Sequence, residues 1–429
     1  MLMIDIKLVR ENPSIIKDNL RKRNDPEKMK MLDELIKKDE KARKLKFEID
    51  NLKSQRNKIS LEISELKKAK KDASKQLKDA SKIPEQIKNL EEDIKKLEDE
   101  INFILMRMPN ILHDSVPIGK DDTENVEIKK WGKIPKFGFE PKNHLEILEK
   151  LDLIDSERAL KVAGHGFFYN KEELVILDLA LLRFAIDHLR KKGFTLINPP
   201  YMMRTKPYEG VTDLSEFESV QYKVDGEDLR LISTAEHPMA AMFMDEVIEK
   251  KKLPIKMIGV SPCFRKEVGA HGKYTKGLFR MHQFHKVEQF ILSTPEDSWD
   301  LHEELQENAE EIYQALEIPY KVVDVCTGDI GIVAAKKYDI EGLMADGKYR
   351  ELGSNSNCTD FQARRLNIRY TEKEGQKTAG FVHTLNNTAL ATSRTMVCLI
   401  ENHQQKDGSV KIPKALWPYT GFKEISPKK

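Results

Sequence analysis

The feature that most constrains the fold is residues 27–108, which contain no glycine and repeat their apolar residues every seven positions. In the first half the repeat occupies two sets of positions, Leu35, Ala42, Ile49 and Ile63 in one, and Leu45, Leu52, Ile59 and Leu66 in the other. In the second half apolar residues alternate steps of four and three, at Ile83, Ile87, Leu90, Ile94, Leu97, Ile101, Ile104 and Met108. Such a seam is typical of coiled coils. The segment is therefore predicted to form a hairpin of two long antiparallel helices.

The length of the first helix indicates where the second begins. A helix of about 44 residues is about 60 Å long. The second helix must return over the same distance, so we expect it to begin near Ala73, where Ala73, Leu77 and Ala80 extend its seam. Pro84 lies inside this helix and is expected to kink it.

The end of the hairpin farthest from the body is basic. Residues 53–82 hold ten Lys or Arg and four Asp or Glu, whereas residues 91–100 are acidic. A charged stretch is usually a solvated helix face. A basic excess at the tip of an arm also suits binding to a phosphate backbone. Taken alone, the pattern leaves a nucleic-acid arm and a protein–protein coiled coil open.

Length, charge and cysteine use set further limits. A chain of 429 residues exceeds what one core usually serves, so we predict two domains, at 1–110 and 111–429. The net charge is only +2, so nucleic-acid binding has to come from local patches. The four cysteines form no CxxC pair, which argues against zinc and disulfides. No apolar run is long enough for a signal peptide or a membrane span, so we expect a cytoplasmic protein without a membrane partner.

The pattern changes after a connector, residues 109–145, that is rich in proline and glycine. Residues 174–192 are amphipathic and predict a helix, and a second helix is expected at 303–319. Short apolar runs at 193–200, 256–260, 284–292, 320–325 and 381–385 predict strands. This arrangement favours an α+β domain built on a mostly antiparallel sheet flanked by helices.

One segment, CFRKEVGAHGKYTKGLFRMHQFHKVEQF (Cys263–Phe290), concentrates residues that suit nucleotide binding. On a strand, Arg265 and Glu267 would share a face, one to hold a phosphate and the other to accept from an amino group. The loop VGAHGKYTKG has the composition of a basic lid. Arg280 and Phe284 are expected on the returning strand, where Phe284 could stack on a purine for about 1–3 kcal/mol. The plainer alternative, a surface hairpin with incidental charges, explains any one of these residues but not the whole set.

The GxxxxGK[ST], Rossmann GxGxxG, GxSxG and HExxH signatures are absent. Instead, FRKE…RMHQF resembles motif 2 of the class II aminoacyl-tRNA synthetases, at about 260–290. The helix with GFTLINPP resembles motif 1, at about 172–200, and NTALATSRTMVCLIENHQQKDGSVKIPKALWPY resembles motif 3, at about 386–419.

More narrowly, the chain resembles the seryl-tRNA synthetase family over nearly its whole length. The segments STAEHPM and ELGSNSNCTDFQARRLNIRY, with the leading hairpin, carry this likeness. Three local departures, KEVG, TSR and DIEGLMADGKYRE, suggest an archaeal-like member.

The resemblance implies an ATP-dependent ligase that forms seryl-adenylate and then seryl-tRNA(Ser); whether tRNA(Sec) is also charged stays open. It implies Arg265, Glu267 and Arg394 as catalytic residues and Mg²⁺ held with ATP by Glu351. The implied ATP-binding residues are Arg265, Lys266, Glu267, Arg280, Met281, Phe284, Glu351, Leu352, Gly353, Ser354 and Arg394.

The implied serine-binding residues are Thr234, Ala235, Glu236, Arg265, Glu288, Asn386 and Thr388. A site that pairs with the substrate hydroxyl can reject alanine by about 10⁴–10⁵. Considered alone, Glu236 or Glu288 is more simply explained as a solvated strand residue, but both occupy motif-matched positions, which favours serine binding. The plain alternative for Thr388 is a small polar turn residue, and serine binding is favoured there too.

The resemblance also implies partners. The arm would bind the long variable arm of tRNA(Ser), mainly through backbone and shape. The candidate lysines at its tip are Lys67, Lys68, Lys70, Lys71, Lys75 and Lys78. Motif 1 would form a homodimer. Two alternatives are disfavoured. Relatives that load a carrier protein lack the tRNA arm that this chain keeps, and the intact Arg265, Glu267, Glu288 and Arg394 argue against an inactive regulator that binds tRNA or a partner through the coiled coil.

Overall fold

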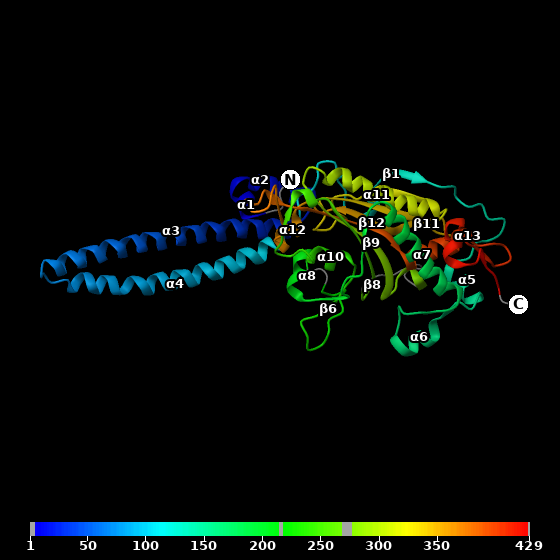
Figure 1. Ribbon diagram of the computed structural model, residues 1–429, viewed down its shortest axis with the longest axis horizontal. Helices are drawn as coiled ribbons and strands as arrows, with labels where there is room; N and C mark the ends of the chain where they lie inside the picture. Colours follow the sequence, from blue (N-terminus) through cyan, green and yellow to red (C-terminus); the bar gives the residue numbers. More distant parts are fainter. Residues whose placement is uncertain (1–4, 214–217, 268–276, 428–429) are drawn as a thin grey trace. The chain divides into compact units, whose positions relative to one another are not determined.

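In the computed structural model, residues 5–213, 218–267 and 277–427 are described. The chain divides into two compact units, Ile4–Pro109 and a second that contains Asn110–Lys429. Figure 1 shows a helical unit coloured from blue to cyan, and a unit of sheet and helices coloured from cyan, at β1, to red.

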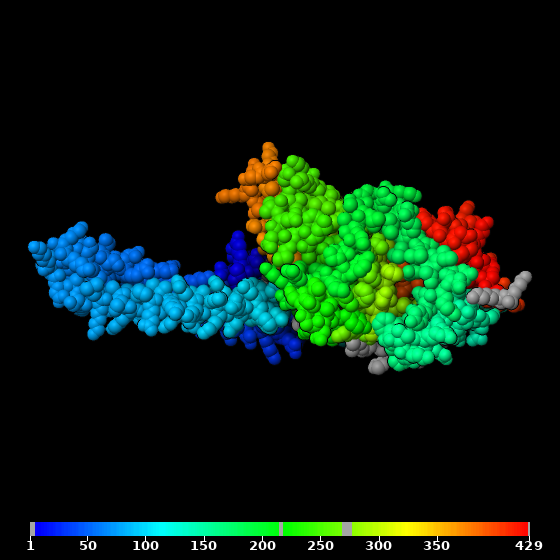
Figure 2. Space-filling view, turned by 60° about the horizontal axis from the view of Figure 1, so that its bottom comes forward, coloured from blue at the N-terminus to red at the C-terminus, as the bar shows by residue number. Residues whose placement is uncertain are grey.

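The helical unit is the predicted hairpin with two short helices before it. Its elements are α1 (Ile6–Glu11), α2 (Pro13–Lys22), α3 (Pro26–Lys68) and α4 (Ser74–Leu105). Asp25 caps α3 by accepting a hydrogen bond from the Lys28 amide at 2.9 Å. Ala73 is the N-cap of α4, where the length argument placed the start of the second helix. Figure 2 shows α3 and α4 packed side by side along the arm.

The seam of the hairpin differs from the prediction at one position. Ile49, Ile83, Ile87 and Ile94 are buried between the helices. Leu77, however, is 47% exposed, and the partly buried position on that turn belongs to Gln76. The prediction of Leu77 in the seam was therefore wrong. The helix α4 continues through Pro84.

An eight-stranded sheet organises the second unit, and of its recorded pairings only β4–β8 is parallel. Its order is β1 (Val126–Trp131), β10 (Tyr320–Asp324), β11 (Lys336–Leu343), β12 (Tyr349–Asn357), β15 (His383–Ala391), β9 (Gln283–Ser293), β8 (Ile255–Phe264) and β4 (Thr195–Ile197). The fold class predicted from the sequence is confirmed.

Smaller sheets and helices surround it. The smaller sheets are β14 (Gly380–Phe381), β13 (Arg369–Thr371) and β7 (Val247–Glu249); β16 (Val410–Lys411) and β17 (Glu424–Ile425); β2 (Ile154–Asp155) and β3 (Tyr169–Asn170); and β5 (Met202–Met203) and β6 (Arg230–Leu231). The helices are α5 (His144–Lys150), α6 (Ser156–Ala163), α7 (Glu173–Lys191), α8 (Thr205–Val211), α10 (Glu236–Ala241), α11 (Ser298–Ala315), α12 (Phe361–Leu366), α13 (Thr392–His403) and α14 (Trp417–Thr420).

The two faces of the sheet serve different purposes, because side chains alternate along a strand. On β9, Val287 and Ile291 join the larger core, under α7, α11 and α13. Phe290 and Leu292 point the other way, into a second core with residues of α8, α10 and α12. Glu288 has the same parity as Phe290, so the sheet turns it toward α10. This second face carries the candidate site.

Candidate active site

The segment around Arg265 departs from the predicted geometry. Strand β8 ends at Phe264, and Glu267 adopts a left-handed backbone with φ +49°. The same-face argument requires an extended backbone, so it fails here. Arg280 likewise precedes β9, which begins at Gln283, and so does not lie on the returning strand. Both strand placements were wrong.

The fold nevertheless brings these residues together. Arg280 Nε donates to Glu267 Oε2 at 2.5 Å. Arg265 Nε donates to the Ser233 carbonyl at 3.4 Å, and its guanidinium lies 5.4 Å from the centre of the Phe284 ring. The predicted lid, VGAHGKYTKG, falls largely at residues 268–276, outside the described residues.

Arg394 lies in the first turn of α13 and contacts the ELGS segment of β12. Its Nη1 is 3.1 Å from Glu351 Oε1 and donates to the Glu351 carbonyl at 3.0 Å. Its guanidinium lies 5.1 Å from the centre of the Phe279 ring. Phe279 was not singled out from the sequence, although it immediately precedes Arg280.

Other predicted ATP residues occupy varied environments. Lys266 lies over the Tyr222 ring at 5.7 Å. Met281 is half-buried and packs against the larger core. Leu352 is 1% exposed and belongs to that core, so its side chain faces away from the site. At Gly353 a Cβ atom would come within 2.9 Å of Thr388, so only glycine fits without a shift.

Glu351 forms part of a charged group on β11 and β12. Ser354 Oγ donates to Glu351 Oε1 at 3.4 Å, and Lys337 Nζ is 3.1 Å from Asp339 Oδ2. Burial raises the pKa of Asp339 to about 6. The Glu351 side chain is 46% exposed. Nearby protein raises its pKa by displacing water, but Arg394 and Lys337 outweigh this and lower the pKa to about 2.

Glu288 forms the centre of the predicted serine site. It is fully buried on β9. Thr388 Oγ1 donates to Glu288 Oε2 at 3.2 Å and Asn386 Nδ2 to Oε1 at 3.4 Å, both from the adjacent strand β15. Lys286 Nζ lies 2.5 Å from Glu288 Oε2. Lys286 was missed, although its two-residue spacing from Glu288 on a strand could have signalled it.

Glu236 approaches from α10. Its backbone amide donates to Thr234 Oγ1 at 3.2 Å, and Gln362 Nε2 donates to Glu236 Oε1 at 2.9 Å. Burial, then the like charge of Glu288, raise the pKa of Glu236 to about 7. Ala235 packs on Gly259, where a Cβ atom would lie 2.6 Å from the Ala235 Cβ. Gln362 was also missed, although it lies within the SNCTDFQARR motif.

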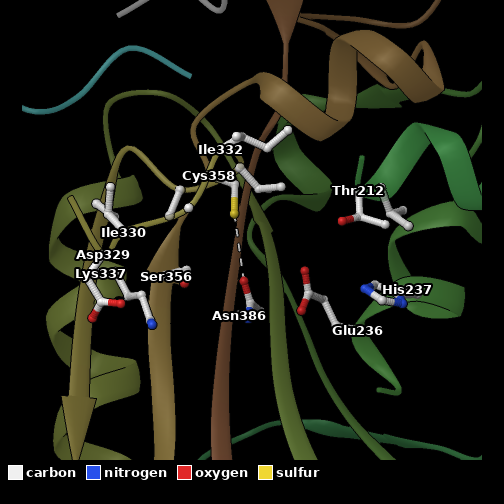
Figure 3. A pocket seen from close by; sticks show the side chains of 14 residues that line it. Thr212, Glu236, His237, Asp329, Ile330, Ile332, Lys337, Ser356, Cys358 and Asn386 are labelled. Carbon is white, nitrogen blue, oxygen red and sulfur yellow. Dashed lines mark hydrogen bonds between the residues drawn. The ribbon is translucent and has the colours of Figure 1, made fainter. Parts of the chain in front are cut away.

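A pocket of about 260 Å³ adjoins this group. Figure 3 shows Glu236 and Asn386 pointing into it, and Asn386 Oδ1 lies 3.7 Å from Cys358 Sγ. Its other lining residues are Val211, Thr212, His237, Asp329, Ile330, Gly331, Ile332, Val333, Ala334, Lys337 and Ser356. The carboxylate of Glu236 lines the pocket and that of Glu288 lies near Glu236. Together with the polar side chains of the wall, they can hold a small cationic or zwitterionic ligand that carries a hydroxyl.

Two structural tests concern metals and membranes. Across residues 5–213, 218–267 and 277–427, no group of three or more His, Cys, Asp or Glu is arranged to hold a metal ion. Within the same ranges, no helix is long and apolar enough to cross a membrane.

Comparison with known proteins settles the family. The seryl-tRNA synthetase N-terminal domain model matches residues 3–112. The class II core domain model for the Gly, His, Pro, Ser and Thr enzymes matches residues 219–403. A serine–tRNA ligase of Methanospirillum hungatei is 55% identical over 424 residues, 99% of this chain and 100% of the relative. The chain belongs to the seryl-tRNA synthetase family.

Solved structures of seryl-tRNA synthetases agree in fold. The enzyme of Pyrococcus horikoshii, complexed with ATP, superposes with a TM-score of 0.96 and 51% identity, covering 100% of both chains. The cytoplasmic enzyme of Naegleria fowleri, in complex with AMP, has a TM-score of 0.91 and 36% identity, also over 100% of both. The family resemblance is confirmed, including its archaeal-like character.

Proposed function

We propose that the chain is an ATP-dependent serine–tRNA ligase. It activates L-serine with ATP to seryl-adenylate and pyrophosphate, and then transfers the seryl group to the 3′-terminal adenosine of tRNA(Ser) with release of AMP. The observation that carries the proposal is the buried group of Glu288, Thr388 and Asn386 beside Glu236, in a full-length member of this family. The Glu236 carboxylate can attract the ammonium of serine, and Glu288, Thr388 and Asn386 can pair with its hydroxyl.

We assign the phosphate chemistry to arginines. Arg265 donates to the Ser233 carbonyl, lies near the Phe284 ring and acts electrostatically on Glu236. From there it can bind the serine carboxylate and the α-phosphate and stabilise the charge that develops at phosphorus. Arg280 and Arg394 are assigned to the outer phosphates. The activation step needs no protein base, since the serine carboxylate itself attacks the α-phosphate and pyrophosphate leaves.

We assign the adenine to the surroundings of Phe284 and Glu267. Phe284 offers a ring for stacking. Arg280 orients Glu267 through Oε2, and the other oxygen, Oε1, is the one assigned to the adenine amino group. Arg394 is proposed to cover the opposite face of the base. Lys266, Met281 and the segment from Glu351 to Ser354 complete the proposed ATP site.

Mg²⁺ suits the donors near Glu351. Mg²⁺ prefers oxygen ligands and usually takes one or two carboxylates together with substrate phosphates. Glu351 and Asp339 supply carboxylates, and Asp339 Oδ1 is buried without a hydrogen-bond partner among the described residues. We propose that Glu351 holds Mg²⁺ with ATP, where the ion would neutralise phosphate charge.

We propose that the basic tip of the arm binds the variable arm of tRNA(Ser), with tRNA(Sec) as a second candidate substrate. A homodimer through motif 1 is supported by exposed apolar side chains on one stretch of the catalytic unit. They are Val175, Ile176 and Leu179 on α7 and Leu196, Tyr201 and Met202 near β4 and β5. Exposed apolar side chains gathered in one part of the sequence are consistent with an interface. A cytoplasmic location stays a prediction.

The proposal is tested by acylation of tRNA transcripts. With ATP, Mg²⁺ and labelled serine, we expect serine at the 3′ end of a tRNA(Ser) transcript. The same transcript with a shortened variable arm should be charged more slowly, because the arm binds shape and backbone. Acylation of a carrier protein, or failure to charge any transcript by a well-folded preparation, would contradict the proposal.

A further inference from the structure

The buried lysine beside Glu288 has a part in the site that the family resemblance did not supply. Lys286 is 5% exposed, and Glu288 is 0% exposed. Both lie on β9 two residues apart, and therefore on the same face of the strand. Lys286 Nζ is 2.5 Å from Glu288 Oε2 and donates to Thr388 Oγ1 at 3.3 Å. The ammonium thus contacts two of the proposed serine-binding side chains at once.

These contacts determine how Glu288 can act. Lys286 and Thr388 both occupy Oε2, while Asn386 donates to Oε1. Three donors from two strands fix the orientation of one carboxylate. The like charge of Glu288 raises the pKa of the nearby Glu236 carboxyl, and the ammonium of Lys286 opposes that rise. A buried carboxylate costs free energy unless it is paired, and here Lys286 supplies the paired cation.

We infer that Lys286 is a positioning residue for serine selection, which holds Glu288 charged and correctly oriented for the substrate hydroxyl. The inference rests on the proposed function. Lys286 acts through Glu288 and Thr388 and need not touch the substrate. The effect should fall on serine recognition and leave ATP binding unchanged, because its recorded contacts are with serine-site residues.

The first test is kinetic. Serine-dependent ATP–pyrophosphate exchange would be measured for wild type, K286M and K286R, with serine and ATP varied separately. We expect K286M to raise the KM for serine about 10- to 100-fold, with the KM for ATP changed by less than about twofold. K286R keeps the cation and should recover much of the loss. Equal increases in both KM values, or no change in either, would overturn the inference.

A matched control separates this role from general loss of an ion pair. Lys256 on β8 pairs with Glu304 on α11 at 2.7 Å, on the opposite side of the sheet. K256M should leave the KM for serine at the wild-type value. An effect of K256M equal to that of K286M would mean that both act by weakening the fold, and would overturn the inference.

A double-mutant cycle tests whether Lys286 acts through Glu288. Adding K286M to E288Q should change the KM for serine by less than about twofold, because the partner is already neutral. Full additivity would overturn the inference. The double variant also buries no unpaired charge, so it remains informative if K286M alone fails to fold. Absence of serine-dependent exchange in wild type would instead refute the proposed function.

Discussion

The helical hairpin and the candidate site obtain their order in opposite ways. In the hairpin, buried residues follow one another at steps of three and four along the helix, as at Ile94, Leu97, Ile101 and Ile104. In the site, Glu236, Glu288 and Asn386 come from three elements separated by long stretches of chain. The hairpin is built by local repetition, whereas the site depends on the register between strands. Substitutions should therefore have separable effects on the two.

The largest expected effect is on the chemistry of the catalytic unit. Arg265→Ala should lower serine-dependent exchange by about 10²- to 10³-fold, because it removes a charged donor from the reacting phosphate. The control is Arg158→Ala, whose side chain is 79% exposed and pairs only at the surface with Asp155. It should retain wild-type exchange. A comparable loss of serine-dependent exchange in both variants would contradict the proposed role of Arg265 at the reacting phosphate.

The next effect is on the stability of the hairpin. Ile87→Ala should lower the free energy of unfolding of the arm by about 2–4 kcal/mol, because it removes buried methyl groups from the seam. Leu77→Ala is the matched control, because Leu77 is 47% exposed. This substitution should change the free energy of unfolding of the arm by less than about 0.5 kcal/mol. Hydrogen exchange of α3 and α4 amides measures both. If Leu77→Ala lowers the free energy of unfolding as much as Ile87→Ala does, Leu77 and not Gln76 lies in the seam at that turn.

A smaller effect is expected from the basic tip. Replacing Lys67, Lys68, Lys70 and Lys71 with alanine should lower tRNA(Ser) charging about 10- to 100-fold and flatten its salt dependence. Adenylate formation, followed as ATP–pyrophosphate exchange, should stay unchanged. Exchange that falls in parallel with charging would show that the arm supports folding of the enzyme and not tRNA binding alone.

The smallest effect concerns pH. Burial and Glu288 raise the pKa of Glu236 to about 7, so its carboxylate is protonated below that pH and ionised above it. If the ionised form attracts the serine ammonium, the KM for serine should rise by up to about tenfold per pH unit below 7 and level off above it. In E236Q the pH dependence should flatten. A profile unchanged in E236Q would assign the titration to another group.

The sequence predicted the hairpin well because its information is local. The single error, Leu77 in place of Gln76, arose because the apolar pattern weakens where alanine and glutamine occupy the seam. The strand error at Glu267 has another cause. A left-handed residue that is not glycine or asparagine leaves no clear signal in the sequence.

The polar residues of the site were predicted through motif resemblance, and the missed ones share a property. Lys286, Gln362 and Phe279 act by contact with other site residues, namely Glu288, Glu236 and Arg394. Such contacts depend on strand register and on helix placement, which spacing along the chain does not reveal. Parity on β9 alone could have indicated Lys286.

The most direct test of the account is amino-acid-dependent ATP–pyrophosphate exchange by the full chain, with serine, threonine, alanine, cysteine and glycine measured in parallel. The account predicts exchange with serine alone, because Glu288, Thr388 and Asn386 are assigned to a substrate hydroxyl, which alanine, cysteine and glycine lack. Threonine is expected to be excluded by its additional methyl group. Exchange driven equally well by alanine or threonine, or by none of the five, would contradict it.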